Sequence, residues 1–266
     1  MTAPNKTVWD DPAFAKAWND TYGIDMQKTL IRAELAFPLI ADAIGSFEGK
    51  SLADFGCGNG NLIRHFAGHN FQSWVGIDGG RAILDTAIEN TTDARVTYQH
   101  RDLCHLFKTS ARVDVVTSMF VLEEIPATHL RNFFANVAGM LKADGTALMF
   151  TQHPAYAMME AHKALAAGTP NTKFEGHRGY FDTNPSTYAL QLLNQRDGEP
   201  LMAAHHHKPL MTIVNDAASA GLALTHMVET PAGISSLKNL RVHTPAEGDF
   251  PRFLFLAFRP RNSLTI

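Results

Sequence analysis

The chain has 266 residues, which suits one large α/β domain or a core that carries an inserted segment. A hydrophobic content of 45% is enough for a sizeable core, and a net charge of −3 gives no reason to expect a nucleic-acid partner. Two cysteines are too few for a disulfide framework. We find neither a signal-like start nor an apolar run of membrane-spanning length, so we expect a cytoplasmic protein with no membrane partner.

Residues 1–48 precede the first expected strand and are predicted to be helical. Asp10-Asp11-Pro12 is typical of a helix start, because proline suits the first turn and acidic groups suit its positive end. Phe14, Trp18 and Tyr22 follow at four-residue spacing and form one aromatic face. This face either packs onto the core or belongs to a lid, in which case Trp18, Asn19 and Tyr22 would touch a bound ligand.

A glycine-rich turn follows the first expected strand. Residues 51–55 predict a buried strand, glycine stands at positions 56, 58 and 60, and a helix is expected from Asn61. Glycines permit positive φ and let a ligand approach bare backbone, and the helix start adds N–H donors and partial positive charge. The pattern predicts a nucleotide-like ligand over the end of a strand, in an α/β crevice.

Two nucleotide ligands compete for this turn. The dinucleotide fingerprint G-x-G-x-x-G/A presses backbone amides on a pyrophosphate, but here Asn61 takes its third position. Asp54, just before the glycines, would repel a pyrophosphate and suits a ligand with positive charge. S-adenosylmethionine (SAM) carries an ammonium and a sulfonium and has no phosphate. The charges therefore favour SAM over a nicotinamide cofactor.

Two further acidic residues follow expected strands. Residues 73–78 predict a second strand that ends at Asp78. The number of residues between Gly60 and Asp78 is close to that expected for a carboxylate that binds ribose hydroxyls. The alternative is that Asp78 only caps the next helix, expected over 81–89. A third strand, expected over 94–100, leads to Asp102.

Asp54-x-Gly56-x-Gly58-x-Gly60 resembles the first motif of class I SAM-dependent methyltransferases. The resemblance implies SAM as cofactor, with Asp102 accepting a hydrogen bond from the adenine amino group and Leu103 donating its backbone N–H to the ring. It predicts these cofactor-binding residues: Asp54, Gly56, Cys57, Gly58, Asn59, Asp78, Gly79, Asp102, Leu103, Met119, Trp18 and Tyr22.

Strands four and five are expected over 113–118 and 146–151, with a helix over 126–141 and a turn at 142–145 between them. Glu123 and Glu124 either orient an acceptor and neutralise the sulfonium or cap the helix. The Asn-Pro-Pro-Tyr type motif of enzymes that methylate exocyclic base nitrogens is absent, which counts against a nucleic-acid substrate.

His153 follows strand five, where it would face the methyl group. It is predicted as a general base, the alternative being that it only caps the strand or binds substrate. His153-Pro154, Tyr180-Phe181-Asp182 and His206-x-Lys208-Pro209-Leu210 resemble pieces found in a subset of small-molecule methyltransferases, with Lys208 in place of the usual arginine. Tyr180 and His206 are therefore the other catalytic candidates. No metal is expected, because the adjacent histidines at 205–207 point in different directions.

These features predict an α/β fold, a Rossmann-like seven-stranded methyltransferase sheet with an N-terminal helical lid and a substrate cap after strand five. The last helix and strands are expected over 209–220, 222–227 and 252–258. The expected divisions are a lid (1–48), a SAM-binding core (49–154), a cap (155–208) and the end of the core (209–266).

The predicted function is SAM-dependent methyl transfer to a small molecule, in secondary metabolism. The alternative is an enzyme of the same fold that cyclises SAM and releases methylthioadenosine. An interaction protein that had lost SAM would usually have lost the glycines or the acids. The sequence leaves the acceptor atom and the oligomeric state open.

Overall fold

The computed structural model describes residues 7–24, 31–156, 179–181, 183, 186–190, 201–231 and 251–263, with backbone alone for 186–190, 201–204 and 231. Most of the expected cap, including Asp182, lies outside the described residues. The strands are β1 (Ser51–Phe55), β2 (Ser73–Asp78), β3 (Val96–His100), β4 (Val113–Met119), β5 (Leu141–Gln152), β6 (Ser186–Leu190), β7 (Leu201–His205), β8 (Leu222–Pro231) and β9 (Pro251–Pro260). The helices are α1 (Pro12–Tyr22), α2 (Phe37–Ile44), α3 (Asn61–His65), α4 (Arg81–Glu89), α5 (Leu130–Met140) and α7 (Leu210–Ser219).

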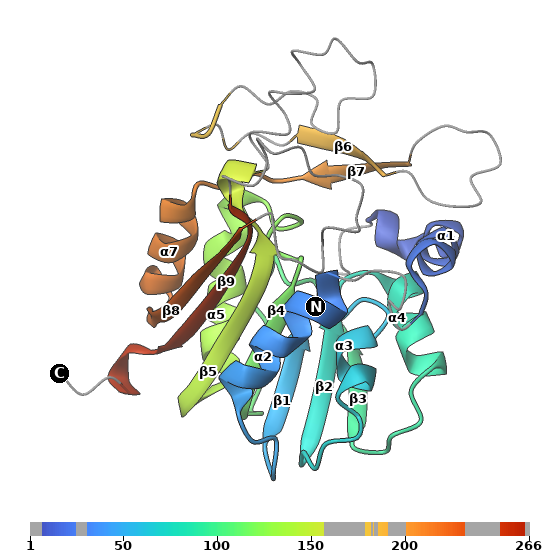
Figure 1. Cartoon of the computed structure of the whole chain (residues 1–266), viewed down its shortest axis with the longest axis horizontal. Coiled ribbons are helices and arrows are strands. Elements are labelled where there is room, and N and C mark those ends of the chain that lie inside the picture. Colours follow the sequence, from blue (N-terminus) through green and yellow to red (C-terminus); the bar gives the residue numbers. More distant parts are fainter. Residues whose placement is uncertain are drawn as a thin grey trace.

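The described strands build a seven-stranded sheet in the order β3-β2-β1-β4-β5-β9-β8, and β6 pairs with β7 in a separate two-stranded ribbon (Figure 1). Strands β1 to β5 are parallel, and β9 is antiparallel to both of its neighbours. This order confirms the expected Rossmann-like methyltransferase sheet. The carboxyl ends of β1, β2, β4 and β5 therefore share one edge, below the β6–β7 ribbon in Figure 1.

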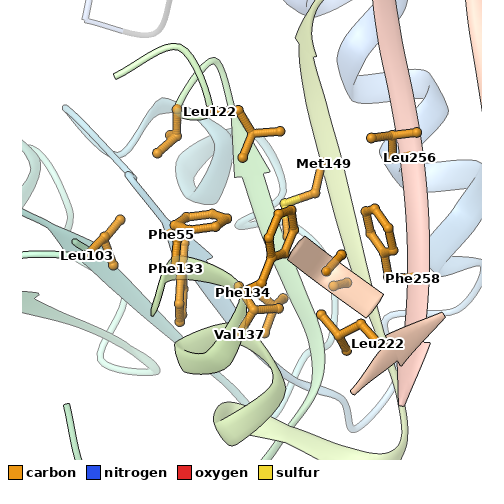
Figure 2. Packing of buried hydrophobic residues seen from close by; sticks show 14 of the residues in the cluster. Phe55, Leu103, Leu122, Phe133, Phe134, Val137, Met149, Leu222, Leu256 and Phe258 are labelled. Atoms are coloured by element: carbon orange, nitrogen blue, oxygen red, sulfur yellow. The ribbon is translucent and has the colours of Figure 1, made fainter. Parts of the chain in front are cut away.

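Helices cover both faces of this sheet, as the alternation of side chains along a strand requires. Ala53, Phe55 and Met149 point to the face covered by α5 and α7, where they pack with Phe133 and Phe258 (Figure 2). The intervening side chains point to the opposite face, against α2, α3 and α4, and are Leu52, Val115, Leu148, Phe253 and Phe255.

The range 1–48, expected as one lid, contains two kinds of segment. Leu35, Phe37, Ile40 and Ile44 are buried in the same cluster as β1 and β5 and so belong to the core. Helix α1 packs instead beside α4 (Figure 1), in a small cluster of its own. Among the described residues of this range, the segment 7–24 therefore forms the part that packs apart from the main core.

The start of α1 and its aromatic face are as the sequence predicts. Asp11 caps the helix, its side chain accepting the Ala13 N–H at 2.8 Å, and Pro12 occupies the first turn. The Trp18 ring lies 4.5 Å from the Tyr22 ring and 4.9 Å from the Trp9 ring, measured between centroids. Trp18 and Tyr22 both stay partly exposed on this face.

Strand β5 starts earlier than expected, which corrects the predicted turn at 142–145. Leu141 already pairs with Val113, and the register then shifts so that Val115 pairs with Thr146. Residues 142–145 thus form an irregularity inside β5, where Lys142 Nζ donates to both carboxylate oxygens of Asp114 at 2.8 Å.

Strand β8 also runs beyond the predicted end at 227 and carries Glu229 to the carboxyl edge. Across the described residues, we find no helix with the length and apolarity that a membrane crossing needs.

Truncating one aromatic residue in each cluster should separate the core from the N-terminal segment. Phe133 is fully buried against Phe55 and Phe134, so Phe133→Ala should lower the free energy of unfolding by ~3–5 kcal/mol. Trp18→Ala should leave the main unfolding transition within about 1 kcal/mol of wild type and increase hydrogen exchange within residues 7–24. Calorimetry and exchange measure the two effects. Equal loss of global stability in both variants would contradict this division.

Candidate active site

The turn after β1 needs glycine for three different local reasons. All three glycines have positive φ: +73° at Gly56, +54° at Gly58 and +77° at Gly60. A Cβ on Gly56 would lie 2.2 Å from a methyl of Val121, and one on Gly60 would lie 2.5 Å from the Tyr98 hydroxyl. Nothing lies within 4 Å of the corresponding position at Gly58. Bare backbone at Gly58 therefore faces open space, where a ligand can approach.

Asp78 ties this turn to the end of β2. One carboxylate oxygen accepts the Gly58 N–H at 2.8 Å and the other accepts the Gly80 N–H at 2.7 Å. Burial raises the pKa of Asp78, and these two backbone donors oppose the rise. The carboxylate keeps further lone pairs for a ligand hydroxyl, so its position fits the ribose role predicted for it.

Asp54 lies at the end of β1 and is almost completely buried. Its Oδ1 accepts a hydrogen bond from Thr117 Oγ1 of β4 at 2.8 Å. Burial raises the pKa of Asp54 to about 7, the Thr117 hydroxyl lowers it, Asp78 raises it and Arg32 lowers it. A positively charged ligand group placed beside Asp54 would favour its ionised form.

Asp102 closes the turn that follows β3. Its Oδ1 accepts the Cys104 N–H at 2.8 Å, and its Oδ2 lies 2.8 Å from Nδ1 of His105. Leu103 beside it is buried. The carbonyl of Gly79 lies 2.8 Å from Nε2 of His100, which joins the turns after β2 and β3. The residues predicted to hold ribose and adenine thus lie on adjacent turns.

Helix α1 contacts the glycine turn directly. Asn59 donates its side-chain amide to Oδ1 of Asn19 at 2.8 Å and to the carbonyl of Ile24 at 3.0 Å. Arg64 donates to that same Ile24 carbonyl and to the carbonyl of Asn59. Asn59, predicted to bind cofactor, therefore holds the N-terminal segment against the turn. Cys57 and Met119 are buried in the core cluster beneath it.

His153 is buried at the end of β5 and both of its ring nitrogens have partners. Nδ1 accepts the Ala155 N–H at 3.1 Å, so the ring proton lies on Nε2 and is donated to Glu229 Oε1 at 2.8 Å. The Glu229 side chain is 48% exposed, so this pair reaches solvent at the carboxyl edge. A proton taken up by the ring would have a carboxylate beside it.

Tyr180 and His206 belong to a separate group around the start of α7. The Tyr180 hydroxyl accepts the Leu210 N–H at 3.0 Å, and its carbonyl accepts from His207 Nε2 at 2.8 Å. The His206 N–H donates to the Glu123 carbonyl at 2.8 Å. Burial lowers the pKa of the His206 ring to about 4, with Lys208 and His129 adding to the effect.

Lys208 is buried beneath this group and lines a small cavity together with Glu123. Lys208 Nζ donates to the carbonyls of Ile125 and His206, and burial lowers its pKa to about 7 while Glu123 opposes the fall. Glu123 accepts the Gln152 N–H at 2.6 Å, and burial raises its pKa. The cavity that these two residues help to line has a volume of about 20 Å³, which is room for about one water molecule.

Most of the cofactor candidates lie around the turns after β1, β2 and β3, whereas Met119 ends β4 and Trp18 and Tyr22 lie on α1. The catalytic candidates are divided between the His153 pair and the start of α7. Sequence analysis missed Arg32, Tyr98 and Glu229. Tyr98 packs against Gly60 and Gly76. The available signal in the sequence was an aromatic residue in the strand that follows a glycine-containing strand. Nothing local in the sequence links Glu229 to His153, which lies 76 residues earlier.

Residues 52–145 match the family model described as a methyltransferase domain. Together with the strand order and the glycine turn, this match identifies residues 52–145 as a class I SAM-dependent methyltransferase domain. SAM is the cofactor that this domain family uses.

The chain matches less than two thirds of the length of its curated relatives. The ubiquinone biosynthesis O-methyltransferase of Coxiella burnetii is 29% identical over 102 residues, which is 38% of this chain and 42% of that protein. The protein of the same name from Glaesserella parasuis is 26% identical over 144 residues, 52% of this chain and 59% of its own.

Solved structures share the fold over most of the chain. A SAM-dependent methyltransferase from Mesorhizobium loti has a TM-score of 0.63 at 22% identity and covers 84% of this chain and 96% of its own. The CcbJ methyltransferase from Streptomyces caelestis has a TM-score of 0.67 at 16% identity, with 96% and 99% covered.

Replacing the buried carboxyl of Asp54 should change how stability depends on pH. Folding raises the pKa of Asp54 from its ordinary value of 3.8 to about 7. The folded wild type therefore loses stability as the pH rises from about 3.8, and the loss is complete above about pH 7. Asn carries no charge and still accepts from Thr117. The unfolding temperature of Asp54→Asn relative to wild type should therefore increase between about pH 5 and about pH 8.

Asp85→Asn is the matched control, because this aspartate is exposed on α4. Its unfolding temperature relative to wild type should change little over the same pH range. An Asp54→Asn difference that is equal at both pH values would contradict the buried, titrating carboxyl.

Proposed function

We propose that this chain transfers the methyl group of SAM to a small-molecule acceptor. The observation that carries the proposal is the pair of carboxylates beside the open backbone at Gly58, the buried Asp54 and the half-buried Asp78. This arrangement disfavours a pyrophosphate and suits a nucleoside with a positively charged tail. When bound, SAM supplies an electrophilic methyl group on a sulfonium.

The residues around this crevice would bind and orient the cofactor. Asp78 would accept the ribose hydroxyls, and Asp102 and Leu103 would hold the adenine on the neighbouring turn. Trp18 and Tyr22 of α1 would cover the site, since the Asn19–Asn59 hydrogen bond fixes that helix on the glycine turn. Such alignment, with water excluded, contributes roughly 7–11 kcal/mol to methyl transfer.

His153 is the proposed general base. One ring nitrogen would give up its present hydrogen-bond partner and take the proton of the acceptor. Glu229 would stabilise the positive charge that results on the ring. His206 suits this task less well, because a pKa of about 4 makes it a weak base near neutral pH. Tyr180 and Lys208 are proposed to position the start of α7 beside the acceptor.

The acceptor is proposed to be a small molecule from secondary metabolism and not a nucleic acid, since a net charge of −3 offers no excess of positive charge. The names of the curated relatives suggest that hydroxylated aromatic compounds should be tried first, with the oxygen as the methylated atom. We propose that the segment 155–208 forms the cap over this acceptor and that the protein is cytoplasmic.

The test is to incubate the protein with SAM and a panel of phenols, catechols and amines, and to identify the by-product by mass spectrometry. S-adenosylhomocysteine that accumulates only with an acceptor is the expected result. Methylthioadenosine formed without an acceptor would contradict methyl transfer and indicate cyclisation of SAM.

The His153→Asn variant tests the base. Turnover at a saturating concentration of the best acceptor should fall by about 10²–10⁴-fold, because Asn keeps polar contacts and has no basic nitrogen. Glu229→Gln should give a smaller loss, since it removes charge and keeps a hydrogen-bond partner. His206→Asn should retain most of the activity. A fall of less than tenfold in His153→Asn, with the acidic limb of the pH profile retained, would exclude His153.

A further inference from the structure

Glu123 joins three elements at the carboxyl edge of the sheet. It lies in the turn that follows β4, and its Oε1 accepts the Gln152 N–H, at the end of β5, at 2.6 Å. Its backbone carbonyl accepts the His206 N–H, before α7, at 2.8 Å. The residue is therefore held between the strand end that leads to His153 and the segment that leads to α7.

The second carboxylate oxygen of Glu123 lacks such a contact. Burial raises the pKa of this carboxyl, and the Gln152 N–H and the Thr151 hydroxyl act against the rise. No group in the described part of the chain, however, hydrogen-bonds Oε2, and this atom is buried. A buried carboxylate oxygen without a donor is unfavourable, so native structures usually supply one from the protein, from water or from a ligand.

Lys208 is the cation whose charge acts on Glu123, but its ammonium is directed elsewhere. Nζ donates to the carbonyls of Ile125 and His206. An ammonium has three N–H donors, so a third is available beyond these two bonds. Lys208 and Glu123 both line the cavity of about 20 Å³. A group that enters this cavity would therefore find one hydrogen-bond donor and one acceptor.

This pair of side chains discriminates among the polar groups of a ligand. A hydroxyl can donate to Oε2 of Glu123 and accept from Nζ of Lys208 at the same time. A second ammonium would be repelled by Lys208, a carboxylate would be repelled by Glu123, and an ether oxygen has no proton to donate. A water molecule has the same capacity as a hydroxyl and would be displaced by it.

The cavity also lies where an acceptor is expected. Gln152 and Pro154, which flank the proposed base His153 in the chain, both belong to its lining. Residues 205–208, the last of the expected cap, line it as well. A molecule with one group in this cavity could thus present another group to His153.

We propose that the cavity between Glu123 and Lys208 binds a hydroxyl of the acceptor that is not itself methylated, so that the protein prefers acceptors with two hydroxyl groups. The inference rests on the proposed function and adds a specificity-determining site to it. Glu123 would accept the proton of this hydroxyl, and Lys208 would donate to its oxygen. The hydroxyl that is methylated would lie beside His153.

Titration calorimetry on protein saturated with S-adenosylhomocysteine tests this site without turnover. The probes are catechol, 2-methoxyphenol, in which one hydroxyl is an ether, and phenol, which lacks that group. Wild type should bind catechol about 10- to 100-fold more tightly than either of the others, the range for hydrogen bonds to charged groups. Glu123→Gln keeps an oxygen for the Gln152 N–H and places an N–H donor where Oε2 was, so the advantage of catechol should fall below about twofold.

Glu89→Gln is the matched control, because this glutamate is exposed at the end of α4 and the variant should bind all three probes as wild type does. Lys208→Arg keeps the charge and brings a longer, forked head group into the cavity, so it should also remove the advantage of catechol. This variant serves if Glu123→Gln does not fold.

Three results would overturn the proposed site while leaving cofactor binding intact. They are equal affinity of wild type for the three probes, no binding of any of them, and an advantage of catechol that persists in a folded variant of Glu123 or Lys208. A wild type that does not bind S-adenosylhomocysteine in the first step would contradict the proposed function as well.

Discussion

The hydrogen bonds from Gly58 and Gly80 to one carboxylate, Asp78, are the interaction on which the site depends. They join the turns after β1 and β2, which belong to adjacent parallel strands. The first turn can reach Asp78 only with positive φ at three alternate residues, so it is built from glycine. The crevice therefore has two acidic groups, Asp54 and Asp78, beside its glycine turn.

This acidic crevice is linked to the N-terminal segment both by charge and by hydrogen bonds. Burial raises the pKa of Asp54 to about 7, and the charge of Asp78 adds to the rise. The charge of Arg32, in the segment before β1, lowers this pKa. The same segment is held to the glycine turn through Asn19 and Asn59. The electrostatics of the site and the position of α1 are thus coupled.

Local patterns sufficed for the centre of the fold. The bounds of β1, β2 and α4 agree with the sequence prediction, because each is an apolar run or amphipathic helix bounded by glycine. The turn predicted at 142–145 was wrong because Leu141 pairs with Val113, a contact that local sequence does not encode. The His153–Glu229 pair and the place of Arg32 depend on long-range packing of the same kind.

The most direct measurement is a crystal structure of the protein with S-adenosylhomocysteine. The account predicts ribose hydroxyls within hydrogen-bond distance of Asp78, adenine beside Asp102 and Leu103, and the amino-acid end beside Asp54. A ligand whose ribose lies away from Asp78, or whose amino-acid end points away from Asp54, would contradict it.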